Sequence, residues 1–245
     1  MKKLRIEAIA LREGQTEEVN SFVKSLSKWI AYAAVKQSAQ TDGRSFSETI
    51  YRLIRDQDIG IAPILDMIKL IKGIHLTANI TEYPLFEVFE KLASAQHYEF
   101  HDAISIKNDL KGEEAFNLIV AKSGELPLKQ VIDQETIDRP FISISTICEE
   151  LQNLSAELKV IFQKNLALET YLKSVLSALH GLMLWHGREI GSTERYGRGV
   201  SYTFHVATPE QVVQQKFVLF SNGIFSISRP STPSWLSQPS TPAPQ

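Results

Sequence analysis

The residue types most capable of chemistry in this sequence are two histidines and a glutamate at alternate positions, His97, Glu99 and His101. If residues 97–106 form a β-strand, the three side chains point to the same face, and if they form a helix His97 and His101 lie one turn apart. Two imidazoles and a carboxylate on one face could bind a metal ion. The order matches no zinc-protease signature, and no second metal-spaced cluster accompanies it. We therefore interpret the three residues as the solvated face of a strand. No metal or cofactor is expected, and a metal-dependent enzyme is kept as a second alternative function.

A segment rich in glycine and arginine, residues 187–199, is the second candidate site. Glycines let backbone N–H groups approach an anion, and an arginine offers two parallel donors to a phosphate. The charge would come from Arg188, Arg195 and Arg198, and Tyr196 could stack on a base. The glycine spacing fits neither a P-loop nor a dinucleotide-binding fingerprint, and a plain connector between a helix and a strand explains the segment equally. Nucleic-acid binding is therefore the first alternative function.

The C-terminal segment, residues 230–245, has five prolines and no charged side chain. Such a composition cannot bury enough apolar surface to fold alone, so we predict a flexible tail. Trp235 and Leu236 are its large apolar residues, and an aromatic flanked by prolines suits a short motif that binds a protein partner. An inert tail is the alternative.

These candidate sites must be positioned by the rest of the chain, in which a heptad pattern over residues 147–182 is the clearest signal. Apolar residues follow at steps of four and three, and Asn165 fills the one gap. A 3.5-residue repeat predicts one long helix with a stripe that pairs chains, and a lone Asn on it fixes register. The expected oligomer interface comprises Leu151, Leu158, Asn165, Leu172 and Leu179. The stripe widens after Asn165, so packing inside one chain is the alternative.

Capping residues and turn residues predict helices elsewhere. Helices are expected to begin at Thr16, at the capping box Ser45-Phe46-Ser47-Glu48, before Pro63 and near Pro84. Gly73 should end the helix that contains Pro63. These predictions make the N-terminal half mainly helical.

Alternating apolar residues predict short strands at 4–11, 97–106, 116–121 and 200–207, with a hairpin around Asn222-Gly223. The expected fold class is therefore α+β, mainly α-helical. We expect a helical domain with a minor sheet at 1–140, the long helix with a C-terminal antiparallel β-meander at 141–229, and the tail at 230–245.

Composition limits the function. The net charge is −2 and there is a single cysteine, so neither a wholly basic nucleic-acid-binding domain nor an intrachain disulfide is expected. No apolar run is long enough to cross a membrane, and we expect a cytoplasmic protein. Since no reaction motif and no family resemblance stands out, we predict a non-enzymatic, self-associating adaptor or scaffold. It would form a homo-oligomer and bind a protein partner through the tail.

Overall fold

The computed structural model describes residues 16–42, 46–111, 116–123, 134–187, 204–206, 217–220 and 223–227. In this part of the chain the fold is mainly α-helical, as the sequence predicts. Its helices are α2 (Thr16–Thr41), α3 (Glu48–Asp58), α4 (Ile61–Lys72), α5 (Ala78–Thr81), α6 (Pro84–Lys111), α7 (Leu118–Ser123), α8 (Gln134–Ile161) and α9 (Leu166–Gly187). None of these helices combines the length and apolar character that crossing a membrane requires.

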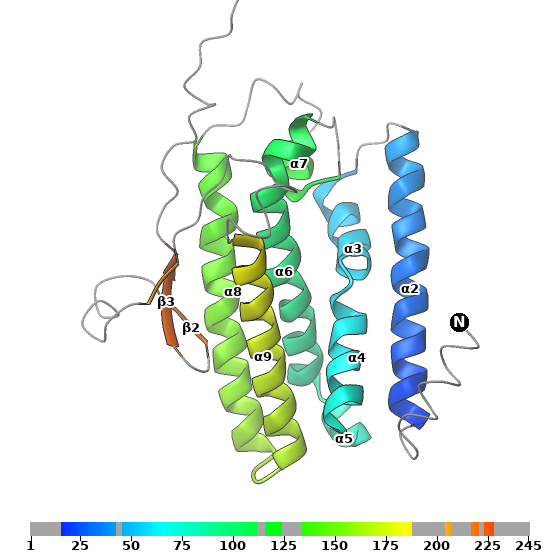
Figure 1. The fold of residues 1–245 in the computed structure, drawn as a ribbon, viewed down its shortest axis with the longest axis vertical. Helices are drawn as coiled ribbons and strands as arrows, with labels where there is room; N and C mark the ends of the chain where they lie inside the picture. The colour runs from blue at the N-terminus through cyan, green and yellow to red at the C-terminus, as the bar shows by residue number, and fades with distance from the viewer. Residues whose placement is uncertain are drawn as a thin grey trace, which may run out of the picture.

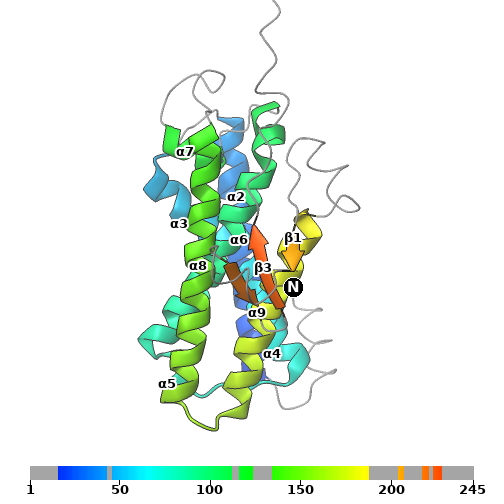
Figure 2. The same cartoon turned by 90° about the vertical axis from the view of Figure 1, so that its left-hand side faces the viewer.

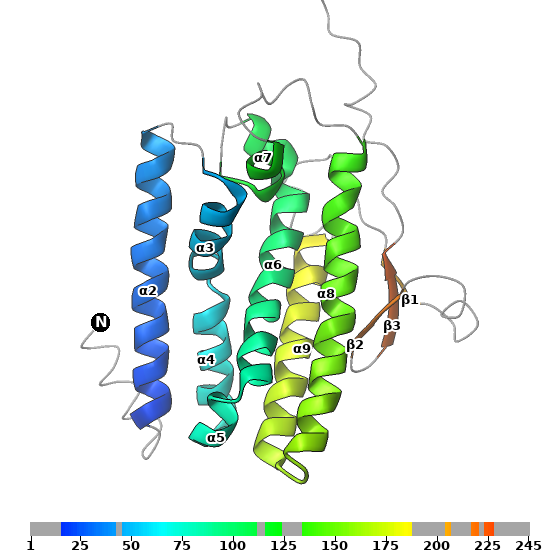
Figure 3. The ribbon, with the colours of Figure 1, turned by 180° about the vertical axis from the view of Figure 1, so that it is seen from behind.

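The long helices lie side by side along the long axis of the molecule. Figures 1 and 3 show α2, the pair α3 and α4, then α6 and α8 across one layer. The helix α9 packs against α4, α6 and α8, and Figure 2 shows it on one side of that layer. The helices α3 and α4 follow each other end to end, because Gly60 between them adopts a left-handed conformation with φ of 83°. One bundle therefore has α3 and α7 at one end and α4 at the other.

The predicted helix starts in the N-terminal half are confirmed. The helix α2 begins at Thr16 and α6 at Pro84. Ser47 caps α3, where its hydroxyl accepts a hydrogen bond from the backbone N–H of Ile50 at 3.5 Å. Gly73 ends α4 with φ of 64°, a conformation that glycine adopts without strain. Cap chemistry is local, so the sequence alone reveals it.

The predicted strands at 97–106 and 116–121 are wrong. The first segment lies inside α6, and most of the second forms α7. The alternating residues Tyr98, Phe100 and Ile106 are all buried, as are most side chains between them. A helix that is buried on nearly every side shows no clean 3.6-residue pattern, so a short alternation in its sequence resembles a strand.

The predicted continuous heptad helix is also wrong, because the chain reverses at residues 162–165. The helix α8 already begins at Gln134, and α9 returns beside it after a short turn. Lys164 has φ of 62° in this turn, and the side-chain oxygen of Asn165 accepts a hydrogen bond from the N–H of Leu168 at 2.9 Å. Asn165 is thus the N-cap of α9, and no apolar seam surrounds it.

The heptad leucines lie in the core of this helical hairpin. Leu151, Leu158, Leu172 and Leu179 are buried within one chain, in a cluster formed with α4 and α6. When two antiparallel helices pack along each other, the apolar face of each helix is turned toward the same core. The heptad repeat of apolar residues can therefore continue from one helix to the next across the turn. Packing inside one chain accounts for the pattern, and association of two copies remains a prediction.

Among the described residues of the C-terminal part there are three short strands: β1 (Phe204–Val206), β2 (Phe217–Phe220) and β3 (Gly223–Ile227). The strands β2 and β3 are antiparallel, with Phe220 opposite Gly223, and β1 pairs with β3. The order β1-β3-β2 differs from that of the expected meander, in which the middle strand would be β2. The first predicted strand, 4–11, lies outside the described residues, and the division into domains stays a prediction.

Candidate functional site

Charged side chains are buried together where α3, α6 and α7 meet. We call Tyr51, Arg55 and Asp58 of α3, with His101 and Asp102 of α6, the polar cluster. Most of its members are almost inaccessible to solvent; Arg55, for example, is 4% exposed. Buried charges are costly unless they are paired and hydrogen-bonded, so such a concentration marks a candidate site.

The guanidinium group of Arg55 lies at the centre of the polar cluster. Its Nη1 donates to Asp58 Oδ2 at 2.8 Å, and its Nη2 donates to Asp102 Oδ1 at 2.7 Å and to His101 Nδ1 at 3.0 Å. Asp58 follows Arg55 by three residues, so one turn of α3 brings them together. Nδ1 of His101 also lies 3.3 Å from Asp102 Oδ1, so the imidazole contacts both members of the Arg55–Asp102 ion pair.

The carboxylate of Asp102 joins all three helices. It accepts hydrogen bonds from Arg55, from the hydroxyl of Tyr51 and from the backbone N–H of Leu118 at 3.0 Å. Leu118 is the first residue of α7, where free N–H groups favour a negative charge. Asp102 therefore neutralises Arg55 and also fixes the start of α7.

A second carboxylate, Asp109, lies two turns further along α6. Its Oδ2 accepts hydrogen bonds from Ser105 Oγ at 2.6 Å and from Asn117 Nδ2 at 2.7 Å. Asn117 also donates to the backbone carbonyl of Asp102 at 2.8 Å. His101, Ser105 and Asp109 follow at steps of four, so an imidazole, a hydroxyl and a carboxylate share one face of α6. Asp109 is only half-buried, whereas Asp102 is fully covered.

Two further imidazoles, those of His97 and His186, lie beside His101 of the polar cluster. The ring of His186 in α9 is centred 5.4 Å from that of His97 and 5.6 Å from that of His101. Burial lowers the pKa of His97 to about 3, and the nearby His186 and Arg55 add to the effect. Burial and Arg55 also lower the pKa of His101. Both imidazoles are therefore neutral at physiological pH.

The predicted grouping of His97, Glu99 and His101 is wrong. On a helix Glu99 points elsewhere, and its Oε1 accepts a hydrogen bond from Arg52 Nη1 at 2.8 Å. The expected solvated face is wrong too, since His97 is 5% and Glu99 2% exposed. Across the described ranges, no three or more histidine, cysteine, aspartate or glutamate side chains are grouped to bind a metal ion by themselves.

The other predicted site residues lie outside the described residues. These are Arg188, Arg195, Tyr196 and Arg198 of the arginine-rich segment, and Trp235 and Leu236 of the tail. The suggested phosphate contacts and the tail motif are therefore untested.

Sequence reasoning missed Tyr51, Arg55 and Asn117, and it considered Asp102 only as a residue that could orient a metal ligand. A charged residue on a predicted helix looks solvated when its partner is distant, and Arg55 and Asp102 are 47 residues apart. The i,i+3 pair of Arg55 and Asp58 was the available local signal, but such pairs are common on exposed helices.

No protein-family model matches this sequence, and no curated protein matches it. Solved structures with the same fold do exist. The linalool/nerolidol synthase from Streptomyces clavuligerus, in complex with 2-fluorogeranyl diphosphate, superposes with a TM-score of 0.60 at 15% sequence identity. A structure of a-eudesmol synthase gives a TM-score of 0.59 at 14% identity.

These likenesses cover 71% of this chain, 61% of the linalool/nerolidol synthase and 57% of the a-eudesmol synthase. The chain thus spans less than two thirds of either synthase. At this identity the comparison shows a shared helical fold. It overturns the predicted non-enzymatic, self-associating adaptor, because the heptad on which that prediction depended belongs to a bundle that enzymes share.

Proposed function

We propose that this chain is an isoprenoid synthase-like enzyme that acts on an allylic diphosphate. The observation that carries the proposal is a fold shared with terpene synthases that has a buried polar cluster at one end of the bundle. The linalool/nerolidol synthase binds 2-fluorogeranyl diphosphate, which is an allylic diphosphate. Of the functions predicted from the sequence, the enzyme alternative agrees best with this shared fold. The site that we propose lies where α3, α6 and α7 meet, and not at the predicted group of His97, Glu99 and His101.

The chemistry of such a substrate explains the need for charged groups. Breaking its allylic C–O bond leaves the electron pair on the diphosphate and an allylic cation on the hydrocarbon. The developing negative charge must be stabilised by groups that are already in place. A magnesium ion supplies this neutralisation when it is bound, since magnesium in proteins is commonly held by one or two carboxylates together with substrate phosphates.

The donors on α6 fit that requirement. Asp109 and Ser105 offer a carboxylate and a hydroxyl oxygen one turn apart, and oxygen is the ligand that magnesium prefers. The side-chain amide of Asn117 holds Asp109 from α7. Arg55 and Asp102 pack α3 and α7 onto the same stretch of α6. In this proposal Asp109 and Ser105 would hold the ion, and Arg55 and Asp102 act as positioning residues.

Incubating the purified full chain with geranyl diphosphate and magnesium chloride tests the proposal. We expect release of inorganic diphosphate and terpene products detectable by gas chromatography with mass spectrometry. Asp109→Asn should lower the rate at least tenfold, because it removes the charge that would hold the ion. Glu87→Gln changes an exposed carboxylate of the same helix and should have no effect. Absence of diphosphate release from the wild type, with magnesium present, would reject the proposal.

A further inference from the structure

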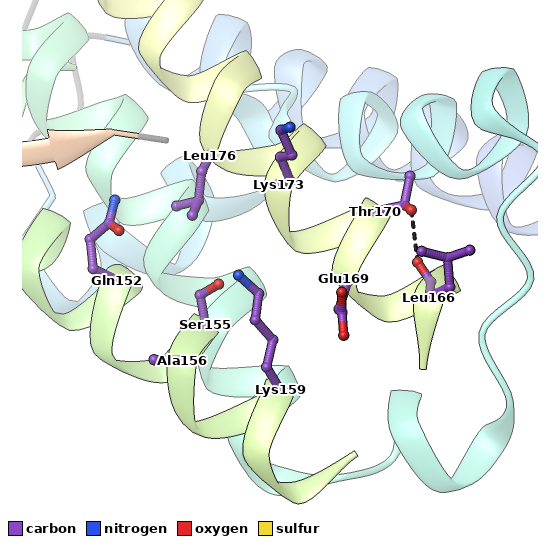
Figure 4. Close-up of a pocket in the computed structure, with 9 residues that line it drawn as sticks. All are labelled: Gln152, Ser155, Ala156, Lys159, Leu166, Glu169, Thr170, Lys173 and Leu176. Atoms are coloured by element: carbon purple, nitrogen blue, oxygen red, sulfur yellow. Dashed lines mark hydrogen bonds between the residues drawn. The ribbon is translucent and has the colours of Figure 1, made fainter. Parts of the chain in front are cut away.

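A cavity of about 780 Å³ lies between α8 and α9, close to the turn that joins them. Figure 4 shows its lining: Ser155 and Lys159 on α8, and Leu166, Lys173 and Leu176 on α9. None of these residues belongs to the polar cluster or takes part in the proposed reaction. The volume is within the range of small-molecule sites, about 300–1,000 Å³.

The hydroxyl of Ser155 is the feature that points to a ligand. Ser155 is 3% exposed, and its Oγ has no hydrogen-bond partner among the described residues. The hydroxyl of Thr170, which also lines the cavity, instead donates to the carbonyl oxygen of Leu166 at 2.7 Å. A buried hydroxyl without a partner is destabilising, so a ligand that accepts its hydrogen bond would recover that free energy.

Two lysines give the cavity its positive charge. Lys159 and Lys173 come from facing helices, and within the described part of the chain neither ammonium group lies within 4.0 Å of a carboxylate. Glu169 also lines the cavity, so its formal side-chain charge is +1. The side chains of Leu166 and Leu176 add apolar surface, and Leu166 is 75% exposed. The lining therefore combines cationic groups, a hydroxyl donor and hydrocarbon.

We propose that this cavity binds a small amphipathic anion. The anionic head group lies between Lys159 and Lys173 and accepts a hydrogen bond from Ser155, and the hydrocarbon chain lies along Leu166 and Leu176. Charge-assisted hydrogen bonds to two ammonium groups fix the head group, while burial of the chain supplies the apolar part of the affinity. This inference stands independently of the proposed enzymatic function, because no residue is shared.

Calorimetric titration of the full chain with octyl phosphate tests the inference. We expect one site per chain. Inorganic phosphate, which has the head group alone, and octyl glucoside, which has the chain without charge, should each bind at least tenfold more weakly. Equal affinity for inorganic phosphate would show that only charge is sensed, and equal affinity for octyl glucoside would show that only the chain is sensed. Either result overturns the inference, as does absence of octyl phosphate binding.

Paired variants locate the site. Lys159→Met together with Lys173→Met should weaken octyl phosphate binding at least tenfold, and Ser155→Ala should weaken it severalfold. Lys72→Met together with Lys91→Met removes the same charge from exposed positions on α4 and α6, and should leave the affinity unchanged. Equal weakening by the two double variants would contradict a defined site. Circular dichroism of each variant separates lost binding from lost folding.

Discussion

The two ends of the helical bundle bury their side chains by opposite means. Near the turn between α8 and α9, Leu158 and Leu168 pack without any exposed surface into a large apolar cluster. At the other end, Arg55 and Asp102 are equally inaccessible but depend on hydrogen bonds to one another. Apolar contacts are distributed over many neighbours, whereas each member of a buried charged network needs its particular partner. The polar end should therefore be far more sensitive to the loss of one group.

Charged groups at the apolar end retain access to water. Tyr171 donates its hydroxyl hydrogen to Glu90, and Lys69 Nζ lies 3.2 Å from the same carboxylate. The side chain of Glu90 is 30% exposed, unlike those of Arg55 and Asp102. Solvent can compensate these groups when a partner is removed, but it hardly reaches Arg55 and Asp102. The two ends of the bundle therefore differ in how much a buried group depends on one particular partner.

The largest effect is expected from Arg55→Leu. This change leaves Asp102 buried without its cation and leaves Asp58 with only Lys36 Nζ, at 3.8 Å. It should lower the free energy of unfolding by roughly 3–5 kcal/mol. Lys91→Leu breaks an exposed ion pair with Glu87 on α6, and should change the free energy of unfolding little. Urea denaturation of both variants measures the difference. If both variants lose the same free energy of unfolding, removing a cation from the polar cluster is no more destabilising than removing one from the surface.

Leu158→Ala probes the apolar end. Removing a fully buried leucine should lower the free energy of unfolding by about 3 kcal/mol, since the cavity that remains adds to the lost burial. Leu166→Ala, at an exposed position of the same hairpin, should change it by less than about 0.5 kcal/mol. Thermal and urea denaturation provide the measurement. A Leu158→Ala loss as small as that of Leu166→Ala would argue against the described core.

Acid should destabilise the polar end through His97. Its pKa is about 3 in the folded chain, whereas the pKa of a histidine in water is 6.5, so the folded state favours the neutral imidazole. Its contribution to stability is fully present above pH 6.5 and is lost as the pH falls toward 3, by up to about 1.4 kcal/mol per pH unit. Denaturation measured between pH 7 and pH 4 should show a smaller slope for His97→Asn than for the wild type.

An exposed histidine provides the control for this pH dependence. A hydrogen bond to Glu18 raises the pKa of His75, so its contribution has the opposite sign: it is present at low pH and is lost as the pH rises. His75→Asn should therefore not reduce the acid slope. If His97→Asn leaves the slope unchanged as well, His97 is not buried in its neutral form.

The smallest change in the free energy of unfolding is expected at the turn between α8 and α9. Asn165→Ala should lower the free energy of unfolding by about 1 kcal/mol, because α9 loses its N-cap. Asn165→Leu should be destabilising for the same reason, whereas the heptad interpretation predicts a gain in stability. Lys164→Gly should stabilise the chain by up to about 1 kcal/mol, since φ is 62° there. Thermal unfolding of the three variants decides between a capped turn and a polar seam.

The sequence predicted those parts of the fold whose signals are local. Ser47, Gly73 and Pro84 mark helix ends because capping depends on a few adjacent residues. The reversal at Asn165 escaped detection because the seven-residue step from Ile161 to Leu168 keeps the heptad in phase across the turn. An Asn before a helical segment is also typical of an N-cap, and this local signal for the turn was not considered.

The candidate site was largely beyond prediction. Arg55, Asp102 and Asn117 come from three separate segments, and their contacts arise only when α3, α6 and α7 pack. His101 was singled out for its chemistry, but a strand was preferred to a helix for residues 97–106, and Arg55, its partner in the structure, was not considered. The two-residue period of a strand placed Glu99 on the same face as His101. The helix places Ser105, four residues after His101, on that face instead. Choosing the wrong backbone period therefore selected the wrong neighbours.

Magnesium-dependent binding of geranyl diphosphate to the polar end tests the central claim most directly. Calorimetric titration of the full chain should show binding that needs magnesium. Asp109→Asn should weaken this magnesium-dependent binding at least tenfold. Lys159→Met together with Lys173→Met removes any magnesium-independent binding of this amphipathic anion in the α8–α9 cavity, and should leave the magnesium-dependent binding unchanged. Binding that is absent in the wild type, indifferent to magnesium or unaffected by Asp109→Asn would contradict the assignment of the polar end as a diphosphate site.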